Sequence, residues 1–216
     1  MWRSAWSVTG WSVAFAAVHS LLASQLVKNW VRRSLGEQCF DGWYRISFNA
    51  LALATFAELL RRFSQLPDRE LYRIRWPWAL PLRLVQLSAV VMLLDANVRI
   101  GVGRMSGVQG LWQWVHGETP IKQNPAQGPQ LEGDWDFRTG GSFRLSRHPN
   151  NLAPLLLWVA HPRMTVRFLT FTLVSALYLI VGSVHEERRL HAGFGEEYCR
   201  YCRGRPFYVP LPRQRT

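Results

Sequence analysis

Cysteine is scarce in this chain of 216 residues, and its scarcity argues against stabilisation by disulfides or by a structural zinc ion. The sequence has three cysteines, Cys39, Cys199 and Cys202, and this small, odd number predicts no disulfide framework. Cys199 and Cys202 have the C-x-x-C spacing, but one such pair cannot supply the four ligands of a tetrahedral zinc site. We therefore expect no metal centre and interpret the pair as two thiols on a short helix.

Acidic residues are also few, since 14 Asp and Glu against 26 Lys and Arg give a formal net charge of +12 at pH 7. Nucleic acid is the usual partner of so basic a chain. The sequence, however, contains no recognition-helix pattern, zinc-finger spacing or aromatic RNA-binding motif, and it has no internal repeat or low-complexity tract. Because the basic residues gather in loops between apolar runs, we expect membrane lipid with anionic head groups, and no nucleic acid, as the partner.

Long apolar runs are what the chain does have, although a mean hydropathy of −0.07 conceals them. The first run carries no Asp, Glu, Lys or Arg and is long enough to cross a bilayer. We interpret it as a retained span and not a signal peptide, because it has no basic start beyond Arg3 and contains His19 and several tryptophans. The runs cover residues 4–27, 46–60, 76–94, 151–160 and 168–184.

These runs predict an all-α fold, a polytopic membrane helix bundle with about five transmembrane helices. With a cytoplasmic C-terminus, the inner loops hold 17 Lys and Arg and the outer segments 8, which favours this orientation. The five arginines of residues 61–75 are an exception on the outer side. We expect one integral membrane domain, residues 1–216, with a three-span part (1–97), a cytoplasmic loop (98–148) and a part that binds a cofactor (149–216).

Ionisable groups at membrane depth are costly and usually face the bundle interior or a wet cavity. His19 lies in the middle of the first run and is either a functional group or a neutral, hydrogen-bonded histidine between helices. Glu58, Arg83 and Asp95 lie near the predicted ends of spans, where structural pairing is the better interpretation. Several tryptophans are candidates for aromatic belts at the lipid boundary, or else for core positions: Trp76, Trp78, Trp112, Trp114 and Trp158.

The densest group of polar motifs is C-terminal. A Gly pair in 139–143 allows the chain to turn and to approach a ligand closely, and a helix is expected to begin at Pro149. Arg147 and His148 would lie at the N-terminal end of that helix, where free N–H groups and the helix dipole suit a ligand carboxylate. Glu186 and Glu187 close the last span, where a carboxylate can bind a ribose diol or an amino group. Tyr198 and Tyr201, three residues apart on a helix, either line an adenine or pack against their neighbours.

In order and spacing, these motifs resemble the isoprenylcysteine carboxyl methyltransferase superfamily over about residues 137–212. The resemblance rests on Thr139-Gly-Gly-Ser-Phe143, Arg147-His-Pro149, Glu186-Glu-Arg-Arg-Leu190, Phe194-Gly195 with Tyr198 and Tyr201, and Val209-Pro-Leu-Pro212. Two N-terminal stretches, His19-Ser-Leu-Leu-Ala-Ser24 and Trp43-Tyr-Arg-Ile-Ser-Phe-Asn49, resemble the bacterial branch that contains the NnrU-like proteins and the methanethiol S-methyltransferases.

The resemblance implies an enzyme of the bacterial inner membrane that binds S-adenosylmethionine on its cytoplasmic side and takes a small-molecule or lipophilic methyl acceptor from the membrane. Phe143 stands where the family usually has a tyrosine, and Asn151 where an aromatic residue is common. Gly182 replaces a substrate-binding arginine of the eukaryotic enzymes, which favours a neutral or small acceptor such as a thiol. The residues expected to bind the cofactor are Phe143, Arg147, His148, Pro149, Asn151, Glu186, Tyr198 and Tyr201.

For catalysis, the candidates are Arg147, which would orient the cofactor or stabilise an anionic acceptor, and Glu187 or His19, which could take the acceptor's proton. The alternative is an NnrU-like non-catalytic membrane protein linked to nitrogen-oxide metabolism, in which the site is a remnant or binds a different ligand such as haem through His19 and His148. A small transporter would need paired charges deep in several spans, and the sequence offers few.

Overall fold

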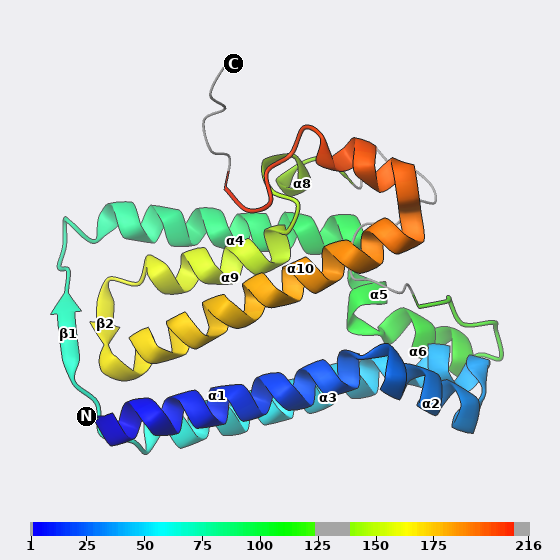
Figure 1. Cartoon of the computed structure of the whole chain (residues 1–216), viewed down its shortest axis with the longest axis horizontal. Helices are drawn as coiled ribbons and strands as arrows, with labels where there is room; N and C mark the ends of the chain where they lie inside the picture. The colour runs from blue at the N-terminus through cyan, green and yellow to red at the C-terminus, as the bar shows by residue number, and fades with distance from the viewer. Residues whose placement is uncertain (1, 124–138, 210–216) are drawn as a thin grey trace. The chain divides into compact units, whose positions relative to one another are not determined.

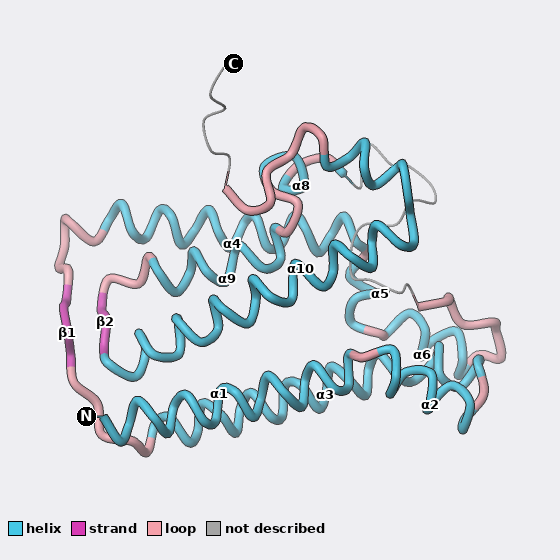
Figure 2. Tube along the Cα trace, viewed as in Figure 1, coloured by secondary structure: helices cyan, strands magenta, loops and turns pink. Residues whose placement is uncertain are grey.

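The computed structural model describes residues 2–123 and 139–209, and almost all of its regular structure is helical (Figures 1 and 2). Two short strands, β1 (Glu70–Arg73) and β2 (Arg163–Thr165), pair in a small sheet that the sequence did not predict. The helices are α1 (Trp2–Ala23), α2 (Gln25–Leu35), α3 (Glu37–Ser64), α4 (Leu80–Ile100), α5 (Val102–Ser106), α6 (Val108–Val115), α8 (Ser142–Leu145), α9 (Pro149–Val159) and α10 (Val166–Cys202).

Among the described residues, three helices are long and apolar enough to cross a membrane: α1 from Arg3, α4 and α10. Much of their apolar surface is not covered by the rest of the chain. On α4, for example, Leu84, Leu87, Val91, Leu94 and Val98 are all exposed. A helix that is apolar on its outer face as well as its inner face is typical of a membrane span.

The other two predicted spans are also helical. Residues 46–60 lie within α3, and residues 151–160 lie almost entirely within α9. With 11 residues, α9 is about 16 Å long, which is roughly half the thickness of a bilayer's hydrocarbon core.

The first apolar helix is shorter than the predicted span of residues 4–27, because α1 ends at Ala23 and the helical stretch is interrupted at Ser24. The Ser24 hydroxyl donates to the carbonyl of Leu21 at 2.6 Å and accepts from the backbone N–H of Val27 at 3.3 Å. Serine is a preferred N-cap residue because its oxygen satisfies a free N–H of the first turn. The Ser24 side chain therefore accounts for the end of α1 and the start of α2 on either side of this residue.

The chain forms two compact units, and the first comprises the described parts of residues 1–72, 102–124 and 164–175. Its core lies along α3, which packs against α1, α2 and α6. Gly42 lets α6 approach closely, since a Cβ there would lie 2.7 Å from the Cβ of Trp114. The Tyr44 hydroxyl donates to the Leu22 carbonyl.

The second unit comprises the described parts of residues 73–101, 125–163 and 176–216. Here α4 and α9 pack side by side and antiparallel (Figure 1). Gln86 donates to the Leu157 carbonyl at 2.8 Å, and Asn97 donates to the Asn150 side chain at 3.3 Å. Small fully buried residues on both helices, such as Ala89 and Ala153, allow the close packing that membrane helices favour.

The three charged residues assigned to structural pairing all have such partners. Glu58 accepts from Arg61 and Arg62, Arg83 donates to Gln86, and Asp95 accepts from Arg99 and Ser142. Their contacts are structural pairs, as the sequence predicts, and the pair of Asp95 with Ser142 joins distant parts of the chain.

Asp68 gives the first unit a pH-dependent stability that can be measured. Burial by itself would raise its pKa, but hydrogen bonds from Arg167, Thr165 and the Arg69 backbone outweigh burial, so the pKa lies below its ordinary value. The Asp68–Arg167 ion pair, 2.8 Å long, therefore stabilises the fold above about pH 4, the unfolded pKa, and its contribution is lost as the pH falls through the lowered folded pKa.

We expect D68N to unfold at a lower temperature than the wild type at pH 6, by the equivalent of about 1–2 kcal/mol. At about pH 3 the difference should shrink, because the wild-type carboxylate is losing its charge. Thermal unfolding in detergent at the two pH values measures it. A difference that stays constant with pH would contradict this assignment.

Candidate active site

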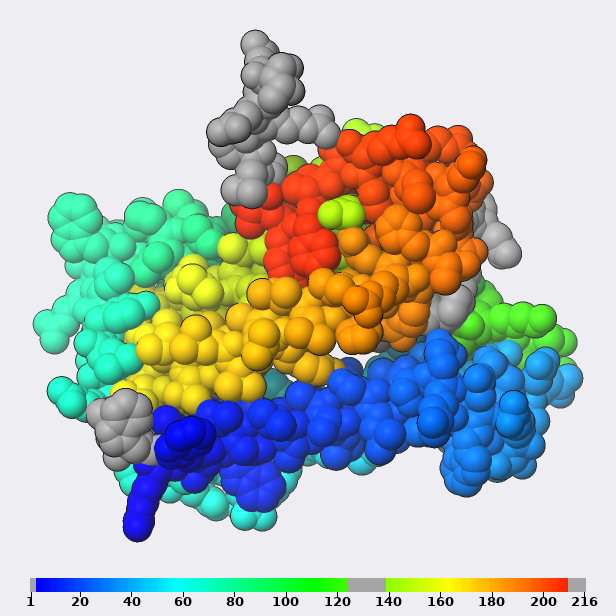
Figure 3. All heavy atoms as spheres, in the orientation of Figure 1, coloured from blue at the N-terminus to red at the C-terminus, as the bar shows by residue number. Residues whose placement is uncertain are grey.

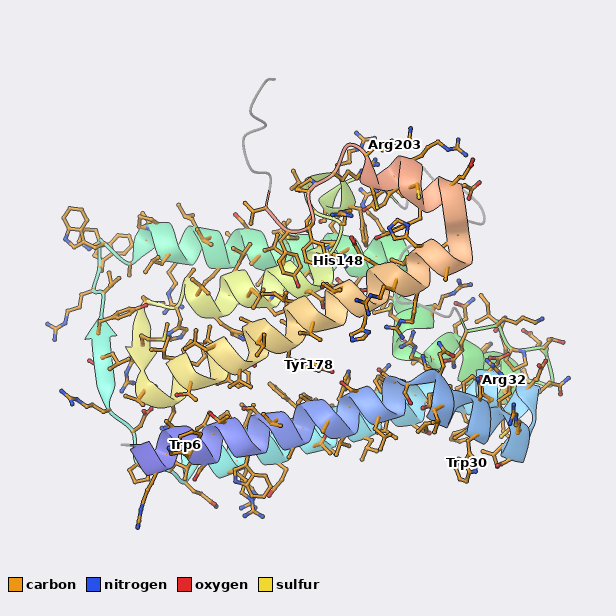
Figure 4. The ribbon with its side chains drawn as sticks, in the orientation of Figure 1. Trp6, Trp30, Arg32, His148, Tyr178 and Arg203 are labelled. Atoms are coloured by element: carbon orange, nitrogen blue, oxygen red, sulfur yellow. The ribbon has the colours of Figure 1, made fainter. Side chains whose placement is uncertain are left out.

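His148 is the centre of a buried polar cluster in the second unit. It lies just before α9. This helix begins at Pro149, because proline already has the helical φ angle and needs no N–H partner there. The His148 imidazole is buried between two carboxylates, with Nδ1 3.5 Å from Oε2 of Glu186 and Nε2 3.1 Å from Oε1 of Glu187. Figure 4 shows its position at the start of α9.

Glu187 gathers the donors of this cluster. Its Oε1 lies 2.8 Å from Nη1 of Arg147, and it also accepts from His148 and, at 3.4 Å, from the hydroxyl of Tyr198. A carboxylate held by three donors is well placed to fix the orientation of Arg147 and His148. Arg147 and Glu187 are 40 residues apart in the sequence. Their mostly buried ion pair joins the two segments that carry them.

Two groups of the cluster have unused hydrogen-bonding capacity within the part of the chain that the structure describes. Glu186 has only the 3.5 Å contact with His148, and Nε of Arg147 is buried without a hydrogen-bond partner. A cation and a carboxylate in one cluster complement a zwitterion, since Arg147 can bind a carboxylate and Glu186 can bind an ammonium group or a diol. Among the described residues, no side chain caps the first turn of α9, and the positive end of the helix dipole favours the same carboxylate.

The Gly pair that precedes the cluster makes the turn that the sequence predicts. Gly141 has a φ of +50°, in the left-handed region that favours glycine. A Cβ at this position would collide with the Asp95 carboxylate and the Arg99 guanidinium. Asp95 accepts from the Ser142 backbone at 2.7 Å and from its hydroxyl at 2.6 Å, and these bonds tie α8 to α4.

A segment that the sequence did not predict as part of the site covers His148. Residues 205–209 return to the start of α9, where Arg147 N–H donates to the Pro206 carbonyl at 3.0 Å and Ser146 Oγ donates to the Phe207 carbonyl at 3.1 Å. The Phe207 ring lies 4.8 Å from the His148 ring and 5.5 Å from the Arg147 guanidinium. Figure 3 shows this segment, in red, against yellow-green atoms of the α8–α9 region.

Tyr208 fastens the same segment to α10. Its hydroxyl lies 2.8 Å from Ser183 Oγ and donates to the Leu179 carbonyl at 3.0 Å. Burial raises the pKa of Tyr208. The Asn151 side chain donates to Ser183 at 2.7 Å, so this predicted cofactor ligand takes part in the fastening network. In the sequence, this segment is marked by the aromatic pair Phe207–Tyr208 just before the Val-Pro motif. Residues 210–212 of that motif lie outside the described part of the chain.

The two tyrosines predicted to face the same way do so. α10 is kinked at Gly195, where φ is 49° and ψ is −124° (Figure 2). Beyond the kink, the rings of Tyr198 and Tyr201 lie 5.7 Å apart and are buried. Tyr201 donates to the carbonyl of the buried Phe143 at 3.0 Å, so Phe143 and both tyrosines adjoin the charged cluster.

His19 belongs to the first unit, where its ring lies 4.8 Å from Phe48 and 5.7 Å from Phe15. The structure thus brings together Arg147, His148, Glu186 and Glu187 in the second unit, with His19 in an aromatic environment of the first. Among the described residues, no group of three or more His, Cys, Asp or Glu could hold a metal ion.

The fold and the cluster define a class of protein: a mostly helical chain with helices able to cross a membrane and a buried Arg–His–Glu site at the start of one of its helices. Methanethiol S-methyltransferase 2 of Bradyrhizobium diazoefficiens is 39% identical over 208 residues, which cover 94% of this chain and 72% of that protein. The chain therefore belongs to the family of the methanethiol S-methyltransferases.

Two further relatives have the same name. The methanethiol S-methyltransferase of Pseudomonas deceptionensis is 36% identical over 86 residues, which are 40% of this chain and 33% of that protein. One from a Pseudomonas species is 28% identical over 203 residues, or 93% of this chain and 71% of that protein. No family model and no solved structure matches the chain.

Proposed function

We propose that this protein is a membrane-embedded methyltransferase that moves a methyl group from S-adenosylmethionine to the sulfur of a small thiol such as methanethiol. Relatives that align with most of the chain are named after this reaction. The observation that carries the assignment of the site is that one cluster contains both a lightly used carboxylate, Glu186, and a buried guanidinium nitrogen, Nε of Arg147, without a partner among the described residues.

The amino-acid end of S-adenosylmethionine is a zwitterion and fits this pair. Arg147 and the open N-terminus of α9 bind its carboxylate, and Glu186 accepts from its ammonium group or from the ribose diol. Glu187 holds Arg147 in place through a contact of 2.8 Å, and His148 lies 3.5 Å from Glu186. The buried rings of Tyr198 and Tyr201 provide an apolar surface for the adenine.

The cofactor supplies an electrophilic methyl group on a positively charged sulfur. The acceptor's S–H proton leaves as its sulfur forms the new S–CH₃ bond and the methyl bond to the sulfonium breaks, which yields a thioether, S-adenosylhomocysteine and a proton. The protein aligns the two sulfur atoms with the methyl group and keeps water away. Glu187 is the proposed proton acceptor, because it lies beside the cofactor ligands.

For the membrane arrangement, we propose five spans: the three long apolar helices, α3, and a fifth in which α9, too short to cross by itself, is completed by the residues that follow it. The C-terminus and the His148 cluster lie on the cytoplasmic side. The excess of basic residues in the corresponding loops supports this orientation.

Haem binding, the alternative that the sequence suggested, finds little support at His148. An axial histidine must present a ring nitrogen to iron, and both nitrogens of His148 face carboxylates at 3.5 and 3.1 Å. A purified protein without a Soret absorption band would agree with this interpretation.

The test uses protein purified in detergent. We expect calorimetric titration to show S-adenosylmethionine binding, and incubation with methanethiol to release dimethyl sulfide, detected by gas chromatography of the headspace. Methanol, the oxygen analogue, and a prenylated cysteine serve as control acceptors. Absence of binding would reject the cofactor assignment. Binding without methylation of methanethiol, but with methylation of another acceptor, would reject only the choice of acceptor.

A further inference from the structure

α2 is a short amphipathic helix that begins just after α1, a helix long and apolar enough to cross a membrane. One residue, Ser24, separates the two helices and caps the start of α2. α2 packs against α1 and α3, but none of its residues is buried. A helix that leaves the end of a membrane span and keeps one side uncovered lies at the boundary between lipid and water.

The uncovered side of α2 combines apolar and cationic side chains. Leu26 and Trp30 are 75% and 67% exposed and are four residues apart, so they share one face of the helix. Arg33, three residues after Trp30, lies on the same face and is exposed, with no ion-pair partner among the residues that the structure describes. Figure 4 shows Trp30 projecting outward from α2.

The charge of α2 has one sign. Its sequence, QLVKNWVRRSL, contains three basic residues and no acidic residue. Lys28 and Arg32 lie on another side of the helix, where the Arg32 guanidinium is 4.4 Å from the centre of the Phe40 ring. Arg33 is therefore the cation of α2 that lies beside the exposed apolar pair.

We propose that the exposed face of α2, formed by Leu26, Trp30 and Arg33, binds the head-group layer of the membrane and prefers anionic phospholipids. Leu26 and Trp30 enter the upper acyl region, and Arg33 bonds the lipid phosphate at the level where tryptophan is favoured. Charge complementarity selects the anionic lipid, since all the charged side chains of the helix are positive. Continuity with α1 places this face next to lipid rather than next to a soluble partner.

The lipid preference can be measured by electron spin resonance with spin-labelled phosphatidylglycerol and phosphatidylcholine around the full-length protein in vesicles. We expect R33Q to reduce the preference for phosphatidylglycerol about fivefold, the ratio that corresponds to one basic residue at a charged membrane surface. R200Q removes the same charge from an exposed position in the last turn of α10 and is the matched control. An unchanged preference in R33Q, or an equal loss in R200Q, would overturn the proposal.

The depth of the face is tested separately with a nitroxide attached at position 30 or, as control, at position 29, in a variant whose three native cysteines are replaced by serine. Asn29 is also exposed but lies about 100° around the helix from Trp30. We expect the label at position 30 to be more accessible to oxygen and less accessible to a polar nickel reagent than the label at position 29. Equal depths would overturn the proposal, as would close pairs of position-30 labels from two copies of the chain.

Discussion

E186Q is expected to bind S-adenosylmethionine about 10- to 100-fold more weakly than the wild type while it folds equally well. Glu186 has a single contact of 3.5 Å in the cluster, so the loss of its charge removes little that holds the protein together. As a ligand of the cofactor, it would make charge-assisted hydrogen bonds worth about 1.5–3 kcal/mol. Calorimetric titration measures the affinity, and thermal unfolding in the same detergent reports the fold.

E197Q provides the matched control for this variant. Glu197 is also a glutamate of α10, but it is exposed and lies beyond the kink at Gly195. The substitution makes the same change in net charge, and we expect it to leave the affinity for S-adenosylmethionine unaltered. If E186Q bound the cofactor as tightly as E197Q, Glu186 would not be a cofactor ligand.

The second large effect is expected at the Arg147–Glu187 pair, where the structural role can be separated from binding. Breaking a mostly buried ion pair leaves one charge without its partner, at a cost of about 3–5 kcal/mol. We expect E187Q and R147Q each to lower the stability by this order. The double variant should lose less than the sum of the two, with a coupling energy of about 1–3 kcal/mol. Denaturant unfolding of the four proteins in mixed micelles gives the cycle.

The control cycle uses Glu58 and Arg61, which form an ion pair of 2.6 Å on the exposed surface of α3. Solvent screens such pairs, so we expect no measurable coupling between E58Q and R61Q. Equal coupling in the two cycles would mean that burial contributes nothing to the Arg147–Glu187 pair. Additive losses in the Arg147–Glu187 cycle would remove the basis for assigning Glu187 an organising role.

Local sequence signals anticipated much of the second unit. Proline at the first position of a helix predicted where α9 begins, and glycine predicted the turn at Gly141. The proximity of His148 to Glu186 was predicted from a family resemblance. Hydrophobic periodicity predicts single helices, but it does not predict which distant residues lie together. The membrane helices followed from length and hydropathy, although only three of the five predicted spans are long and apolar enough by themselves.

The features that escaped prediction depend on contacts between distant segments or on single side chains. Phe207 reaches His148 across 59 positions of the sequence, and no spacing rule connects the two. The break at Ser24 depends on one hydroxyl that satisfies two backbone groups within an otherwise apolar run. β1 escaped notice because its four residues, ELYR, are all exposed and show no alternation of buried and exposed positions.

The position of residues 205–209 over His148 has a practical consequence for anyone who prepares this protein. Arg203 is exposed and stands four residues before Phe207, so a trypsin-like protease that cleaves after Arg203 would separate Phe207 and Tyr208 from the rest of the chain in a single cut. Such a clipped product would still carry α1, α4 and α10, the helices long and apolar enough to cross a membrane. Intact-mass spectrometry of each preparation, with any purification tag at the N-terminus, would distinguish a damaged sample from an inactive enzyme.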